Sequence, residues 1–279
     1  MTWLRERFSF QLIGAHAFLI FYTILALFPV VLVVINSFKS RAAIFRSPYQ
    51  LPNSETWSLI GYETAFSRGS FPLYFYNSIF VTVISLFFIL FLGSMAAFAL
   101  AEYKFPGNTL MGLYLAVGIM IPIRLGTVSL VRLIVDLNLI NTLWALIFVY
   151  IAQGLPISVF ILTSFMQQVP RDLKDAARVD GASEYRIYAM VLPLVRPALG
   201  TVAIFTMIPI WNDLWFPLVL APSENVKTIT LGTQSFLGQF VSDWNAVLAS
   251  LSLAVVPVII LYIIFSRQLI RGLTSGAVK

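Results

Sequence analysis

The chain has 279 residues, of which 59% are apolar and 11% charged, and its mean hydropathy is +0.89, far from the values of ordinary soluble domains. With no cysteine and a single histidine, His16, it excludes disulfides and thiolate metal sites and leaves little for imidazole chemistry, so we expect no metal. The net charge of +6 is scattered between apolar segments and forms no patch with exposed aromatics, so no nucleic-acid partner is expected.

Six apolar stretches are long enough to cross a bilayer as helices. A span needs about 20 mostly apolar residues, because a helix rises about 1.5 Å per residue. Closed β-barrels would need short strands of alternating polarity instead. In chain order the stretches cover residues 12–35, 78–101, 110–131, 143–165, 192–220 and 246–270. We therefore predict an all-α, polytopic membrane protein with six transmembrane helices, organised as one domain over residues 1–279.

The first stretch is too long for the core of a signal peptide, so we expect it to be a retained span. Lys and Arg in the loops predict the orientation. A cytoplasmic N-terminus places 11 of the 18 Lys and Arg residues inside, a modest margin because the first outer segment, 38–71, is itself basic. Both termini are then expected to be cytoplasmic.

Six prolines fall within or near the stretches. Proline removes a backbone donor and allows a helix to kink. We expect most of them to be packing features; they are Pro29, Pro122, Pro156, Pro209, Pro217 and Pro257.

The connection over about residues 167–192 is the longest predicted cytoplasmic loop. Its punctuation predicts a helix over 170–180, with a proline and Asp172 near the start and Gly181 at the stop, and a second helix over 182–192. Two short amphipathic helices meeting at a glycine form a compact knob. The small side chains of Ala176 and Ala177 would let this knob approach another protein closely. The alternative is an ordinary solvated helical hairpin.

The segment DAARVDGAS at 175–183, followed by VLPLVRP at 191–197, resembles the EAA loop of binding-protein-dependent ABC transporter permeases. The C-terminal RGLTSGAVK resembles the tail of carbohydrate-uptake members of the maltose type. Asp175 stands where the family usually has glutamate, and the interval from Gly181 to Leu192 is one residue shorter than the family pattern. Further matches extend the resemblance over nearly the whole chain: FPVVLVVINSFK, YNSIFVTVIS, AAFALAEYKFPG, LNLINTLWAL and WNDLWFPLVL.

The resemblance implies a type I ABC importer permease in the inner membrane, carrying a carbohydrate or sugar derivative. It implies three kinds of partner: a second permease, identical or homologous with a heterodimer favoured, two ATPase subunits, and an extracytoplasmic solute-binding protein. The tail, about 271–279 with Gly272, Gly276 and Lys279, would reach between the ATPases. The loop residues that would dock into an ATPase cleft are Asp175, Ala176, Ala177, Asp180, Gly181 and Ala182.

The sequence contains no G-x-x-x-x-G-K-[ST] phosphate loop. We therefore expect ATP and Mg²⁺ to be bound by the partner ATPases, and this chain to hold no cofactor and to catalyse no covalent reaction.

Polar residues at membrane depth mark a candidate translocation path. Aromatic rings stack on sugar faces and amides or carboxylates bind hydroxyls, so a cluster in the fifth stretch could line it; an aromatic belt at the interface is the alternative. For Asn77 the alternative is a helix cap, and for Arg124 a side chain that reaches the headgroups. The candidate path residues are Trp211, Asn212, Asp213, Trp215, Asn77 and Arg124.

Two other classes of protein are compatible with these features. An ion-coupled secondary transporter or channel would need a carboxylate in mid-membrane, for which Asp213 is the candidate. A membrane-embedded enzyme would need convergent nucleophile, base or metal ligands. A single histidine and no cysteine make the second alternative poor.

Overall fold

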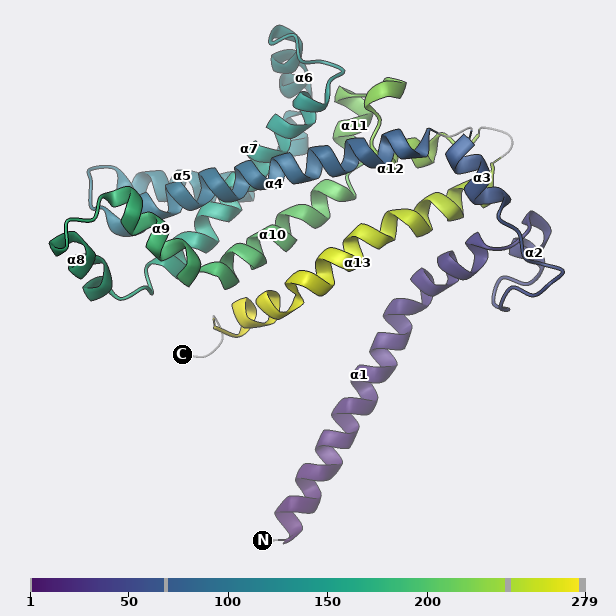
Figure 1. Ribbon diagram of the computed structural model, residues 1–279, viewed down its shortest axis with the longest axis horizontal. Coiled ribbons are helices and arrows are strands. Elements are labelled where there is room, and N and C mark those ends of the chain that lie inside the picture. Colours follow the sequence, from purple (N-terminus) through teal and green to yellow (C-terminus); the bar gives the residue numbers. More distant parts are fainter. Residues whose placement is uncertain (1, 68–69, 239–241, 276–279) are drawn as a thin grey trace. The chain divides into compact units, whose positions relative to one another are not determined.

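The computed structural model describes residues 2–67, 70–238 and 242–275. Its regular elements in these ranges are helices, and the β pairing there consists of isolated bridges such as Lys39 with Trp57 (Figure 1). The all-α prediction is confirmed. The chain divides into two compact units, residues 1–71 with 233–255 and residues 72–232 with 256–279. The expectation of one domain over residues 1–279 stays a prediction.

Unit 1 contains α1 (Thr2–Ser37), α2 (Arg41–Arg46), α3 (Ile60–Ser67) and the first part of α13 (Trp244–Ser275). Its centre is the buried side chain of Lys39, whose Nζ donates to Asn36 Oδ1 at 3.1 Å and to the carbonyl of Ser47 at 2.9 Å. Burial lowers the pKa of Lys39. Asn245 donates from Nδ2 to the Lys39 carbonyl at 2.7 Å, so the start of α13 is attached to the segment after α1.

The core of unit 2 is built around α7 (Leu143–Met166), which packs against α5 (Asn108–Met120) and α10 (Arg196–Trp211). Small residues bring α7 close to α4 (Phe71–Glu102). A Cβ added at Gly93 of α4 would lie 2.1 Å from Ser158 Oγ, and one added at Gly154 of α7 would lie 2.5 Å from Ile89. Such contacts between small residues are how helices approach within a membrane.

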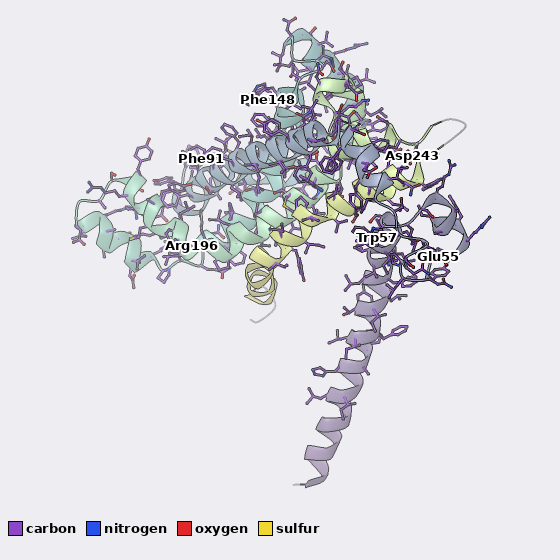
Figure 2. All side chains as sticks on the ribbon, turned by 45° about the vertical axis from the view of Figure 1, so that its right-hand side comes forward. Glu55, Trp57, Phe91, Phe148, Arg196 and Asp243 are labelled. Carbon is purple, nitrogen blue, oxygen red and sulfur yellow. The ribbon has the colours of Figure 1, made fainter. Side chains whose placement is uncertain are left out.

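The outward surface of unit 2 is apolar. Phe91 on α4 and Phe148 on α7 are 44% and 50% exposed and point away from the packed helices (Figure 2). In the apolar 18-residue segment of α7, half of the residues are not buried inside the chain. In that of α4, about two thirds are not buried. These surfaces fit a lipid environment.

Two of the predicted spans are broken rather than straight. The stretch 110–131 is bent by 84° between α5 and the pair formed by the 3-10 turn η1 (Ile123–Gly126) and α6 (Thr127–Asp136). Pro122 explains the position of this bend, because proline donates no backbone hydrogen bond and disfavours helical geometry in the residue before it.

The stretch 192–220 is also interrupted. Its helix α10 is bent by 74° from α9 (Glu184–Leu194) and ends at Trp211, and a short helix, α11 (Trp215–Leu220), follows after three residues. The predicted span over 192–220 is therefore helical but interrupted, and its crossing of the membrane as one span stays a prediction.

Within the described residues, three helical segments are long and apolar enough to cross a membrane, Leu12–Ser37, Phe71–Glu102 and Leu143–Met166. Each bent pair adds one if it counts as a single span, which gives up to five, and Trp244–Ile260 is a shorter apolar helical segment. A polytopic membrane protein is confirmed, and the count of six stays a prediction.

Candidate functional site

The predicted knob is present as two short helices, α8 (Arg171–Val179) and α9 (Glu184–Leu194), within two residues of the expected limits. Gly181 ends α8 with φ +77°, in the left-handed region. Its N–H donates to the Arg178 carbonyl at 3.0 Å, and the Ala182 N–H donates to the Ala177 carbonyl at 2.9 Å. This pair of bonds is the Schellman arrangement that closes a helix, and it requires a residue that tolerates positive φ.

A cluster of charges attaches α8 to the end of α4. The Glu102 carboxylate forms ion pairs with Lys174 and with Arg178. The distance from Arg178 Nη2 to Glu102 Oε1 is 2.7 Å. The Glu102 and Lys174 side chains are only 9% and 5% exposed. Arg178 also contacts Glu184 at 3.0 Å and Asp175 at 2.9 Å. Hydrogen bonds from Arg178, first to Glu184 and then to Glu102, raise its pKa, so the guanidinium keeps its charge in this cluster.

Two tyrosines add contacts between the knob and α4. Tyr103, directly after α4, donates from its hydroxyl to Glu184 at 2.6 Å. Burial and this hydrogen bond raise the pKa of Tyr103 to about 12. Tyr188 of α9 shares a hydrogen bond of 2.7 Å with Ser94. The inner face of the knob is therefore fixed by polar contacts to α4.

The opposite face of the knob is exposed. Val179 is 88% exposed and Tyr185 is 80% exposed, which is unusual for large apolar and aromatic side chains. Of the six predicted docking residues, Ala177 and Ala182 are half-buried, and the exposed ones are Asp175, Ala176, Asp180 and Gly181. The structure thus brings all six together around the end of α8.

Gly272 of the predicted tail lies within α13, which continues to Ser275. Gly276 and Lys279 lie outside the described residues.

A second polar cluster lies at the break between α10 and α11. Asp213 is only 8% exposed there. Its carboxylate accepts from the Tyr150 hydroxyl at 3.0 Å, from Arg124 at 3.2 Å and from the Phe216 N–H at 3.1 Å. Arg124 belongs to η1, so the ion pair joins the bend before α6 to the break before α11. The Arg124 side chain is 65% exposed while it makes this contact.

The other members of the predicted path differ in exposure. Trp211 is buried and meets Phe75 edge to face, with ring centroids 6.1 Å apart. Asn212 is exposed, and Trp215 is 43% exposed with its indole N–H on Thr127 Oγ1 at 3.1 Å. The path and the aromatic belt both remain predictions.

Asn77 lies inside α4, six residues after its first residue, so its alternative role as a helix cap was wrong. The segment before it, FPLYFY, continues the helix because it is apolar and aromatic throughout. Asn77 Nδ2 donates to the carbonyls of Asn225 and Lys227, both at 3.0 Å, and thereby holds the loop that follows α11.

Sequence reasoning missed Glu102, Lys174 and Tyr150, each of which joins segments more than 60 residues apart. The available signal was weak. Glu102 is an acidic residue at the end of a long apolar stretch, where a charge is expensive unless it is paired.

The two sites lie in different parts of unit 2. In Figure 1, α8 and α9 lie at one end, whereas α6 and α11 lie toward the other, and α10 runs between these regions. Apolar helices, two of them broken beside polar clusters, and a charged helical knob define a polytopic membrane protein of the transporter class.

The chain belongs to the family of binding-protein-dependent transport system inner membrane components, whose model matches residues 89–275. It is 33% identical to the diacetylchitobiose uptake system permease protein of Streptomyces coelicolor, over 95% of this chain and 88% of the relative. It is 30% identical to the arabinooligosaccharides transport system permease protein of Bacillus subtilis, over 98% of each. The resemblance stated from the sequence is confirmed, and the chain is an ABC transporter permease.

A solved structure has the same fold. It is a bacterial ABC transporter involved in the import of the acidic polysaccharide alginate, matched with a TM-score of 0.75 over 91% of this chain and 95% of that chain. The identity is 22%, so this likeness supports the fold of an importer permease and nothing finer.

Proposed function

We propose that this chain forms, with a second permease, the membrane path of an ATP-driven importer for a carbohydrate or sugar derivative. The observation that carries the proposal is the knob around Gly181, whose inner face is fixed to α4 and whose outer face is exposed. The choice of cargo is supported by the oligosaccharide systems to which the relatives' names refer.

The proposed partners are a homologous second permease, two ATPase subunits and an extracytoplasmic solute-binding protein. ATP and Mg²⁺ are bound by the ATPases, since this sequence has no phosphate loop. The protein resides in the inner membrane with both termini in the cytoplasm. The tail with Gly272, Gly276 and Lys279 extends toward the ATPases.

Coupling in this proposal is mechanical. When the ATPases close, they move the segment from Asp175 to Ala182. Because Glu102 holds α8 to α4, and α9 leads directly into α10, both long helices follow the knob. The bundle then alternates between inward-facing and outward-facing states.

The proposed translocation path passes the break between α10 and α11. The exposed Asn212 and Trp215 offer an amide and an indole to the solute. Trp211, Asp213 and Arg124 fix the shape of the break. Asn77 holds the neighbouring loop in place.

The absence of native cysteine allows a direct test of the knob's location and partner. Ala176→Cys introduces a unique thiol at the exposed end of α8, and Ser54→Cys does so in the predicted outer segment. We expect the first to resist an impermeant thiol reagent in intact cells and to cross-link to a co-purifying ATPase, and the second to react and not to cross-link. Labelling of Ala176→Cys from outside would refute the proposal.

The alternative function, an ion-coupled transporter, is tested in vesicles supplied with ATP inside. The substrates are the oligosaccharides that the relatives' names mention. We expect uptake to persist when a protonophore and ionophores collapse the ion gradients. Loss of uptake under constant ATP would favour the ion-coupled mechanism.

Asp213→Asn is expected to lower uptake about ten-fold, because hydrogen bonds to a charged acceptor contribute roughly 1.5–3 kcal/mol each and this change weakens several. Initial uptake rates in the same vesicles measure the effect. The matched control is Asp136→Asn on exposed Asp136 at the end of α6, which should leave the rate unchanged. Equal rates for the two variants would remove Asp213 from the path.

A further inference from the structure

An open pocket of about 470 Å³ lies where α4 ends and where α5 and α8 begin. Its polar lining includes three cations, Lys104, Arg171 and Lys174, and one carboxylate, that of Glu102. The pocket belongs entirely to unit 2 and is distinct from the cluster around Asp213.

The charge balance of this pocket favours an anion. Glu102 is neutralised by Lys174 and by Arg178, which stands outside the lining. Lys104 and Arg171 are exposed, and neither forms an ion pair with any residue that the structure describes. Two cations are therefore available to a ligand.

The helix starts at the pocket add to this positive potential. Asn108 and Thr109 are the first residues of α5, and Arg171 is the first of α8. Neither helix is capped by a side chain. Uncapped N-termini carry partial positive charge and free N–H groups, which favour anionic oxygens.

An apolar surface adjoins the cationic lining. Leu100 and Phe105 belong to the pocket wall, and Leu110 and Met111, on the first turn of α5, are 69% and 54% exposed. A small soluble anion would make no favourable contact with this apolar surface. A ligand with a negative headgroup and acyl chains would match both parts, as basic pockets at membrane interfaces do.

We propose that this pocket binds the headgroup of an anionic phospholipid, with the phosphate between Lys104 and Arg171 and the acyl chains along α5. The assignment to the cytoplasmic leaflet rests on the proposed function, because the pocket shares its end of unit 2 with the knob. Lys174 lines the pocket and also pairs with Glu102, so a bound lipid contacts the start of α8, whereas the proposed ATPase contact lies around its end.

The test counts lipids that remain bound to the full-length chain. The chain is placed in nanodiscs of phosphatidylcholine with a minor fraction of phosphatidylglycerol, and native mass spectrometry measures the retained phosphatidylglycerol. We expect selective retention, and in the Lys104→Gln/Arg171→Gln double variant a loss of about five-fold for each cation removed. Retention that is unchanged in this variant would overturn the proposal.

The matched control is the Arg186→Gln/Arg196→Gln double variant, which removes the same charge. Both arginines are exposed at the same end of unit 2, and Arg196 begins α10 (Figure 2). We expect this control to retain the lipid, and an equal loss would mean diffuse attraction rather than a site. A second arm adds inorganic phosphate, and displacement of the lipid by phosphate at matched ionic strength would overturn the lipid assignment in favour of a free-phosphate site.

This result is separable from the proposed function. Lipid retention is measured without an ATPase or a solute, whereas the thiol at Ala176→Cys reports docking. If the lipid is selectively retained but the Ala176→Cys thiol is labelled from outside, the lipid site stands. The cytoplasmic location of the knob is then refuted.

Discussion

Gly181→Val is expected to uncouple ATP hydrolysis from uptake while the chain still inserts into the membrane. At φ +77° an L-residue is disfavoured by about 1–2 kcal/mol, and a β-branched residue fits this region least well. A Cβ at this position would meet nothing within 4 Å, so the effect is conformational rather than a clash. We expect the chain to relieve the strain by changing the angle between α8 and α9, so that the exposed face of the knob no longer fits its partner.

The measurement is the number of ATP molecules hydrolysed per solute imported, in vesicles containing the assembled transporter. We expect this ratio to rise about ten-fold in Gly181→Val, the change that a penalty of about 1.4 kcal/mol produces. Gly181→Asn is the matched control, because asparagine adopts the left-handed region more readily, and it should stay near the wild-type ratio. A wild-type ratio in Gly181→Val would show that the geometry of this turn does not matter for coupling.

Glu102→Gln is expected to have the largest effect on stability of any single change in the charge cluster between α4 and the knob. It leaves Lys174, whose side chain is 5% exposed, without its carboxylate partner. Removal of one member of a buried ion pair costs about 3–5 kcal/mol, because the remaining charge stays buried and uncompensated. We expect a lower thermal transition of the purified protein and weaker cross-linking from Ala176→Cys to the ATPase.

Glu184→Gln provides a matched comparison for this prediction. Glu184 also pairs with Arg178, but its side chain is 46% exposed. Exposed ion pairs contribute about 0–1 kcal/mol, so this variant should melt close to the wild type. Adding Lys174→Met to Glu102→Gln should recover much of the loss, since it removes the buried charge. Equal melting of the Glu102 and Glu184 variants would contradict the role assigned to burial.

Helix limits and bends that are marked by nearby residues could be predicted from the sequence. The two knob helices were predicted closely because a proline, early acidic residues and a glycine mark their ends within a few positions. Among the prolines noted as points of possible kinking, Pro122 does coincide with a bend of 84°. The size of that bend, and the interruption after Trp211, depend on how the segments pack and were not predictable from composition.

The contacts that stabilise each of the two sites join residues that are far apart in the sequence. Glu102 meets Lys174 across 72 positions, Tyr150 meets Asp213 across 63, and Asn77 meets Lys227 across 150. No local periodicity encodes such pairs. The sequence therefore indicated which residues form the knob, and the structure was needed to find what fixes it to α4.

The position of Pro209 within α10 has a consequence for how force travels through the protein. α10 has 16 residues, about 24 Å of helix at a rise of 1.5 Å per residue, and a helix is stiff wherever its hydrogen-bond ladder is complete. Proline removes one hydrogen bond of the helix ladder and makes that point the most compliant. Pro209 precedes Asp213 by about one turn. A push applied where α10 begins is thus expected to produce bending beside the Asp213 cluster, with the rest of the helix moving as one piece.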